Sequence, residues 1–156
     1  MEVHFNADEV MEMAEQLERN GAKFYREASE NVTDPKARAM LLELSKMEED
    51  HEKTFKELRA GLTEEEKVAQ VSGPEDEAEQ YLRAWADTRV FFQRKIDLTS
   101  MKEILKAGID AEEDSIVFYT GMKDVVPESL GKKRIDAIIK EEMAHIRLLS
   151  NKLLAL

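Results

Sequence analysis

Two copies of one short motif, Glu48-x-x-His51 and Glu142-x-x-His145, each place a carboxylate and an imidazole three residues apart. On a helix this spacing puts both side chains on one face, a turn apart. Both motifs interrupt stripes of aliphatic residues at helical spacing, so the two groups should be buried. Burying ionisable groups is costly unless something binds them, and glutamate and histidine together are metal ligands. The motifs therefore indicate a buried metal site.

The two motifs belong to a longer internal repeat, in which every residue of the second copy lies 94 positions after its counterpart (142 minus 48, and 145 minus 51). The same offset pairs Glu18 with Glu112. Taken alone, Glu18 could be an exposed residue beside the apolar seam, but this pairing favours an inward-facing ligand. The repeat also argues against three neighbouring glutamates as ligands, because their counterparts cannot bind a metal in the same way. We expect these three side chains to face solvent. Glu113 pairs with Arg19, Glu141 with Met47, and Glu49 with Met143.

Four long helices are needed to position these residues. A capping pattern predicts a helix from Asn6 to about Asn31, and Asp34-Pro35 begins a second that stops near Gly61. Residues 62–73 read as a loose acidic connection. Residues 74–94 are predicted to form an amphipathic crossover whose aromatic side chains pack against the bundle. The alternative is an aromatic ligand pocket around Trp85. A third long helix starts at Ser100, and a fourth follows the break at 127–129 and runs to the C-terminus.

The predicted fold class is therefore all-α, a four-helix bundle made from two helix-pair repeats. The repeats cover about 6–61 and 100–156, with a long, partly helical crossover at about 62–99, and the whole of 1–156 forms a single domain. A chain of 156 residues is long enough to bury a core. Only 6 glycines and 3 prolines interrupt it, which suits long helices.

Composition narrows the function. The net charge of −11 argues against nucleic acid and anionic membranes as partners, and it suits a protein that attracts cations. The absence of cysteine removes disulfides, thiol catalysis and cysteine-ligated metal centres. We see no signal peptide and no apolar run long enough to span a membrane, so we expect a cytoplasmic protein.

Together the repeats bring four glutamates and two histidines to the middle of the bundle: Glu18, Glu48, His51, Glu112, Glu142 and His145. Four carboxylates carry a formal charge of −4, which two divalent cations balance. Oxygen ligands with one imidazole per metal favour iron or manganese, or a mixed pair of the two, over soft metal ions. Tyr25 and Tyr119 lie two turns after Glu18 and Glu112 on the same face, where their hydroxyls could hydrogen-bond the ligand carboxylates. Ordinary packing is the alternative for both tyrosines.

The pattern resembles the ferritin-like superfamily and, within it, the rubrerythrin-like di-iron carboxylate proteins. The residues that carry the resemblance are Glu18-x-x-Gly21-x-x-Phe24-Tyr25, Glu48-x-x-His51, Glu112-x-x-Ser115-x-x-Phe118-Tyr119 and Glu142-x-x-His145. The resemblance covers essentially the whole chain. It implies a ferritin-like fold, in which the four glutamates and two histidines bind two iron ions that react with hydrogen peroxide or dioxygen.

The chain departs from that family in two respects. Full-length rubrerythrins carry a cysteine-ligated rubredoxin domain that supplies electrons, whereas this chain has no cysteine, so the resemblance implies an external electron donor such as a rubredoxin-type protein. Many relatives also have an additional glutamate one turn before the ligand of the third long helix, where this chain has Ile109. The pseudo-equivalent position in the first repeat is Glu15, which leaves open whether a seventh ligand comes from there or does not exist.

The leading interpretation is a di-iron oxidoreductase, without a rubredoxin domain, that reduces hydrogen peroxide or dioxygen. The alternatives are a ferroxidase or iron-handling protein and, from another class, a helical bundle that binds metal without catalysis. Iron storage would require a hollow cage of many subunits, whereas the long crossover is better suited to a homodimer, including one that exchanges helices.

Overall fold

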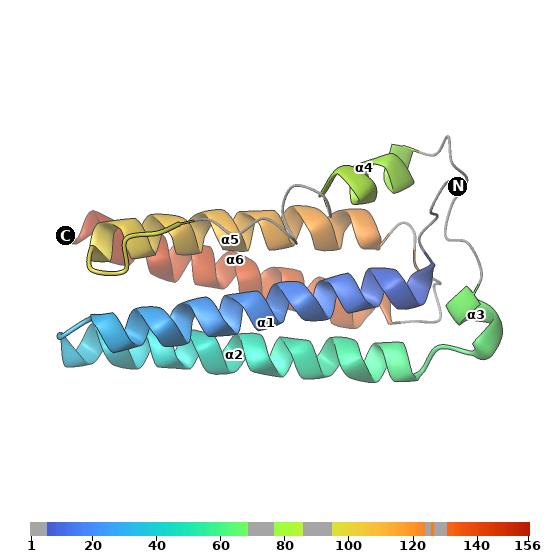
Figure 1. The fold of residues 1–156 in the computed structure, drawn as a ribbon, viewed down its shortest axis with the longest axis horizontal. Helices are drawn as coiled ribbons and strands as arrows, with labels where there is room; N and C mark the ends of the chain where they lie inside the picture. The colour runs from blue at the N-terminus through green and yellow to red at the C-terminus, as the bar shows by residue number, and fades with distance from the viewer. Residues whose placement is uncertain (1–5, 69–76, 86–94, 124–125, 127–130) are drawn as a thin grey trace.

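The computed structural model of the chain describes residues 6–68, 77–85, 95–123, 126 and 131–156. Four long helices form the bundle: α1 (Ala7–Asn31), α2 (Pro35–Ala60), α5 (Met101–Met122) and α6 (Lys132–Leu154). Figure 1 shows α1 and α2 as one antiparallel pair and α5 and α6 as the other. The residues described contain no strand, so the predicted all-α class is confirmed.

The capping residues set the helix starts as predicted. At α1, the side chain of Asn6 accepts a hydrogen bond from the Glu9 backbone N–H, and the Glu9 carboxylate accepts one from the Asn6 N–H. Asp34 caps α2 ahead of Pro35, and Ser100 caps α5 through the N–H of Glu103. Each cap satisfies backbone donors that the first helical turn leaves without partners.

The segment between α2 and α5 differs in part from the prediction. The predicted acidic connection contains a short helix, α3 (Glu64–Val68), begun by a reciprocal pair of hydrogen bonds between Thr63 and Glu66. The predicted amphipathic piece contains α4 (Glu77–Trp85), and the rest of that prediction, 74–76 and 86–94, lies outside the described residues. Figure 1 shows α2 ending and α5 beginning at opposite ends of the bundle, so this segment leads the chain back along its length.

Two apolar clusters form the core, one toward each end of the bundle. One contains Met11, Phe55, Phe118 and Ile135, and the other contains Tyr25, Leu41, Leu105 and Leu149. All four long helices contribute to both clusters, and each carries its predicted metal ligands in the stretch between its two contributions. The core therefore closes over a central polar layer from both ends.

Trp85 belongs to the first of these clusters. Its ring centroid lies 4.6 Å from that of Phe118, and the side chain is buried. This contact favours the packing role of the crossover aromatics over the ligand pocket. None of the described helices combines the length and apolar character needed to cross a membrane.

Candidate metal centre

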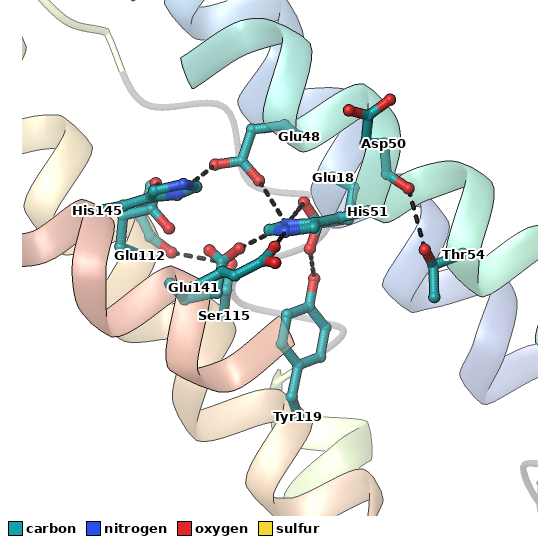
Figure 2. A network of polar contacts seen from close by, with 12 residues as sticks. Glu18, Glu48, Asp50, His51, Thr54, Glu112, Ser115, Tyr119, Glu141 and His145 are labelled. Atoms are coloured by element: carbon teal, nitrogen blue, oxygen red, sulfur yellow. Dashed lines mark hydrogen bonds and ion pairs between the residues drawn. The ribbon is translucent and has the colours of Figure 1, made fainter. Parts of the chain in front are cut away.

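The structure brings all six predicted ligands together in the central polar layer, each at most 3% exposed. α1 and α5 each contribute one glutamate, and α2 and α6 each contribute a Glu-x-x-His pair. Figure 2 shows Glu48 between the rings of His51 and His145. The six residues are Glu18, Glu48, His51, Glu112, Glu142 and His145.

These residues form two overlapping groups of four. Glu18, Glu48, His51 and Glu142 make one group, which we call site A, and the other, site B, has Glu112 and His145 in place of Glu18 and His51. Within each group, the potential ligand atoms all lie within 4.8 Å of one another. Glu48 and Glu142 belong to both groups. They could therefore contribute ligand atoms to two ions, whereas each remaining glutamate and histidine would contribute to one.

Both imidazoles present Nδ1 to the carboxylates. In site A, Nδ1 of His51 lies 2.7 Å from Oε1 of Glu142 and 3.4 Å from Oε2 of Glu18. In site B, Nδ1 of His145 lies 3.3 Å from Oε1 of Glu112 and 3.5 Å from Oε1 of Glu48. The Nδ1 atoms are therefore the ring nitrogens that face the interior of each site.

Several of these inward atoms are buried and make no hydrogen bond of normal geometry among the described residues, although His51 and Glu142 lie within ion-pair distance. They include Nδ1 of both histidines, Oε2 of Glu112 and Oε1 of Glu142. Such atoms are rare in folded proteins, because each one loses its hydration without replacement. Their convergence within two clusters of oxygen and nitrogen donors fits a pair of metal ions.

The two tyrosines predicted beside the site cross between the repeats. The Tyr25 hydroxyl, on α1, donates to Oε1 of Glu112 on α5 at 2.6 Å. The Tyr119 hydroxyl, on α5, donates to Glu18 on α1 (Figure 2). Gly108 leaves room for the first contact, since a Cβ there would lie 3.3 Å from the Tyr25 hydroxyl oxygen. Each tyrosine is therefore both a core residue and a hydrogen-bond donor to a carboxylate.

Burial dominates the electrostatics of the cluster. It raises the pKa of the Glu18, Glu112 and Glu142 carboxyl groups, and the negative charge of Glu48 adds to each shift. Burial alone would also raise the pKa of Glu48, but its contacts with Glu18 and the two histidines lower it below its usual range. Without cations, ionisation in the cluster is therefore most favourable at Glu48 and less favourable at the other three carboxyl groups.

The histidines complement this distribution. Burial would lower the pKa of His145, but contacts with Glu112 and Glu48 outweigh it and raise the pKa to about 9. The pKa of His51 is raised further by Glu142, Glu18 and Glu48. Protons on these groups are what two divalent cations would replace.

These shifts predict that the metal-free protein becomes less stable as pH rises. A group whose pKa is raised by folding stabilises the fold below its unfolded value and loses that effect as pH passes its folded value. For His145 the window runs from 6.5 to about 9, and Glu18 and Glu142 act in the same direction. We expect the melting temperature of metal-free protein to fall by roughly 5–10 °C from pH 6.5 to pH 9.

Thermal melts of metal-free and metal-loaded protein at both pH values measure this effect. The metal-loaded protein is the control, because cations stabilise the ionised carboxylates, and its melting temperature should change little. A metal-free melting temperature that stays constant or rises would contradict the electrostatics described above.

Glu15, the candidate seventh ligand, lies outside both groups. Although it is 4% exposed, its Oε2 accepts a hydrogen bond from Nη1 of Arg59 at 2.8 Å. Arg59 also donates to both carboxylate oxygens of Asp8, at 2.7 and 3.0 Å. Glu15 is therefore neutralised by an arginine and not placed to bind a metal.

The structure also shows a residue that the sequence interpretation missed. Glu141, assigned to solvent because its counterpart is Met47, accepts from Nε2 of His51 on the side of the ring away from the cluster. Its side chain is 52% exposed, so the predicted solvent exposure is confirmed, and only the contact with His51 was missed. Glu49 and Glu113, the other two excluded glutamates, are exposed as predicted.

Comparison with known proteins agrees with this geometry. The family model described as Rubrerythrin matches residues 9–153. A crystal structure from Thermotoga maritima, described as that of a ferritin-like diiron-carboxylate protein, superposes with a TM-score of 0.73 at 26% sequence identity. The alignment covers 98% of this chain and 97% of that one. No curated protein matches the chain.

Proposed function

The chain belongs to the rubrerythrin family, and from that premise we propose that it is a non-haem di-iron oxidoreductase that reduces hydrogen peroxide with electrons from an external donor. The observation that carries the proposal is the pair of overlapping carboxylate and histidine groups with buried, unpartnered donor atoms. Three carboxylates and one imidazole per ion are a hard donor set, which suits iron and manganese better than soft metals.

Each residue has a defined part in this proposal. Glu48 and Glu142 would bridge the two ions, Glu18 and His51 would complete site A, and the ligands of site B would mirror them. When bound, two iron(II) ions supply the two electrons that, with two protons, convert hydrogen peroxide to two water molecules. A separate reductant must return those electrons, because the chain has no cysteine to hold a redox centre of the rubredoxin type.

The surroundings of the site support chemistry on a small oxidant. The two apolar clusters enclose the polar layer from both ends and limit the entry of bulk water along the bundle axis. A cavity of about 320 Å³ between α2 and α6 is lined by His51 and Glu141. In this proposal, peroxide would reach His51, a ligand of site A, through this cavity.

Anaerobic loading with two iron(II) ions per chain, followed by rapid mixing with peroxide or with dioxygen, tests the reaction. We expect iron oxidation, followed by visible absorbance, to be several times faster with peroxide at equal concentration. A Glu49→Gln variant serves as a control, because it removes an exposed carboxylate next to Glu48. It should oxidise iron at the same rates as the wild-type protein.

Faster oxidation by dioxygen would replace the peroxidase with an iron-oxidising function. Oxidation no faster than that of iron in buffer would favour a bundle that binds metal without catalysis.

A further inference from the structure

The two histidines of the metal centre have different partners on their outer nitrogens. Nε2 of His51 contacts the Glu141 carboxylate, whereas Nε2 of His145 is buried with no hydrogen-bond partner among the described residues. Both rings nevertheless turn Nδ1 toward the cluster and stack at 5.9 Å between centroids, with an interplanar angle of 21°. The two rings therefore have similar orientations, but only His51 has a hydrogen-bond partner for Nε2 among the described residues.

The internal repeat explains the difference. Glu141 on α6 supports His51 on α2, so the symmetry-related support for His145 on α6 would come from position 47 on α2. That residue is Met47, whose thioether cannot replace a carboxylate as an acceptor. Met47 and Glu141 also line the same cavity between α2 and α6, as expected for two positions related across the helix pair.

We propose that Glu141 is a positioning residue that makes the two ion sites unequal, so that site A binds a divalent cation before site B. The proposal rests on the metal centre proposed above but not on the reaction. A carboxylate on Nε2–H leaves the lone pair on Nδ1, which is the atom directed at Glu18, Glu48 and Glu142. His145 must adopt the same tautomer with its Nε2–H unsatisfied, which weakens site B.

The charge of Glu141 should favour cation binding at site A, as its effect on the orientation of the His51 ring does. Glu141 adds a carboxylate beside site A, and Asp50 lines the same cavity. The positive group there, Arg134, already forms an ion pair with Glu57 at 2.7 Å. Glu141 is half exposed, so water screens its charge, and we assign its main effect to holding the ring.

Calorimetric titration of metal-free protein with manganese(II), which does not oxidise under these conditions, measures both affinities. We expect two ions per chain whose dissociation constants differ by about 10–100-fold, the usual effect of an outer carboxylate on a histidine ligand. Glu141→Met should weaken the first ion to nearly the affinity of the second. Glu141→Gln, which keeps an acceptor oxygen, should recover part of the loss.

The reciprocal variant, Met47→Glu, should change metal affinity in the opposite direction. Met47→Glu should supply the missing partner to His145 and tighten the second ion, leaving the first unchanged. Glu113→Met is the matched control, because Glu113 is exposed beside Glu112 as Glu141 lies beside Glu142. At one manganese per chain, His51→Ala should lose the tightly bound ion and His145→Ala should keep it.

The outcomes separate the two proposals. If wild-type protein binds two ions and Glu141→Met changes neither affinity, the role of Glu141 is wrong and the metal centre stands. If His145→Ala loses the tightly bound ion and His51→Ala keeps it, the order of the sites is reversed and the proposal fails. If wild-type protein binds no manganese or iron, the metal centre itself is wrong and the inference fails with it.

Discussion

The double variant Glu48→Gln, Glu142→Gln should retain essentially no metal after dialysis, whereas the wild-type protein should retain about two ions per chain. These two glutamates belong to both groups, so each substitution removes a ligand from both sites at once. The formal charge of the cluster also falls from four negative charges to two, which no longer balances two divalent cations. Loss of an outer partner alone costs about 10–100-fold in metal affinity, so loss of shared ligands should cost more.

A second measurement distinguishes loss of the site from loss of the fold. In the wild-type protein without metal, four carboxyl groups are crowded into a buried layer, and three of them have raised pKa values because ionisation there is unfavourable. Replacing two of the four by neutral amides removes part of that repulsion. Glu48→Gln also removes favourable contacts with the two histidines, which opposes that gain. The metal-free double variant should therefore melt near the temperature of metal-free wild-type protein, but added metal should no longer raise that temperature.

Elemental analysis and thermal melts on the same samples provide both readouts. The matched control is Glu49→Gln with Glu113→Gln, which makes the same change in net charge at two exposed positions beside ligands. That control should keep two ions per chain. Full metal retention by the Glu48, Glu142 variant would mean that ions bind elsewhere on this acidic chain.

The second large effect concerns stability and is independent of metal. Arg59→Met should destabilise the fold by about 2–4 kcal/mol, because it leaves the buried Glu15 carboxylate without its cation. We expect a smaller loss of stability than for a fully buried ion pair, because the Arg59 side chain is 29% exposed and water can partly replace it. Asp8, whose pKa Arg59 lowers, loses its partner in the same variant.

Urea denaturation of the variant, followed by circular dichroism, measures the change in the free energy of unfolding. Adding Glu15→Met to Arg59→Met should recover most of the loss, because the unpaired buried charge is then removed. Arg26→Met is the control, since its ion pair with Glu49 at 3.9 Å is exposed on both sides and should contribute less than about 1 kcal/mol. If Arg59→Met behaved like that control, the Glu15 contact would not be a stabilising one.

Much of the fold and the site could be predicted because the internal repeat contains each helix and each ligand position twice. The common offset of 94 identified Glu18 and Glu112, which no local motif would have distinguished from other glutamates in an acidic chain. Capping residues gave the helix starts, because their side-chain bonds are local and need no knowledge of tertiary structure.

What the sequence did not predict consists of contacts that only one repeat makes. The Glu141 contact with His51 and the Arg59 contact with Glu15 join different helices and have no counterpart at the same offset. Comparing the two halves finds what they share, and it excluded Glu141 as a ligand for the same reason that it hid its role. The short helix α3 was missed because five residues between breaks leave too little periodicity to recognise.

The crossed tyrosines have a consequence for how such a chain could arise. Because Tyr25 of the first helix pair serves a carboxylate of the second, and Tyr119 serves one of the first, neither pair holds a complete site. A peptide with a single helix pair would have to associate with a second copy of itself to assemble the same centre. Joining two such copies into one polypeptide would preserve every shared contact and would then free each copy to mutate separately, and a glutamate in one copy opposite a methionine in the other is the kind of divergence that duplication permits.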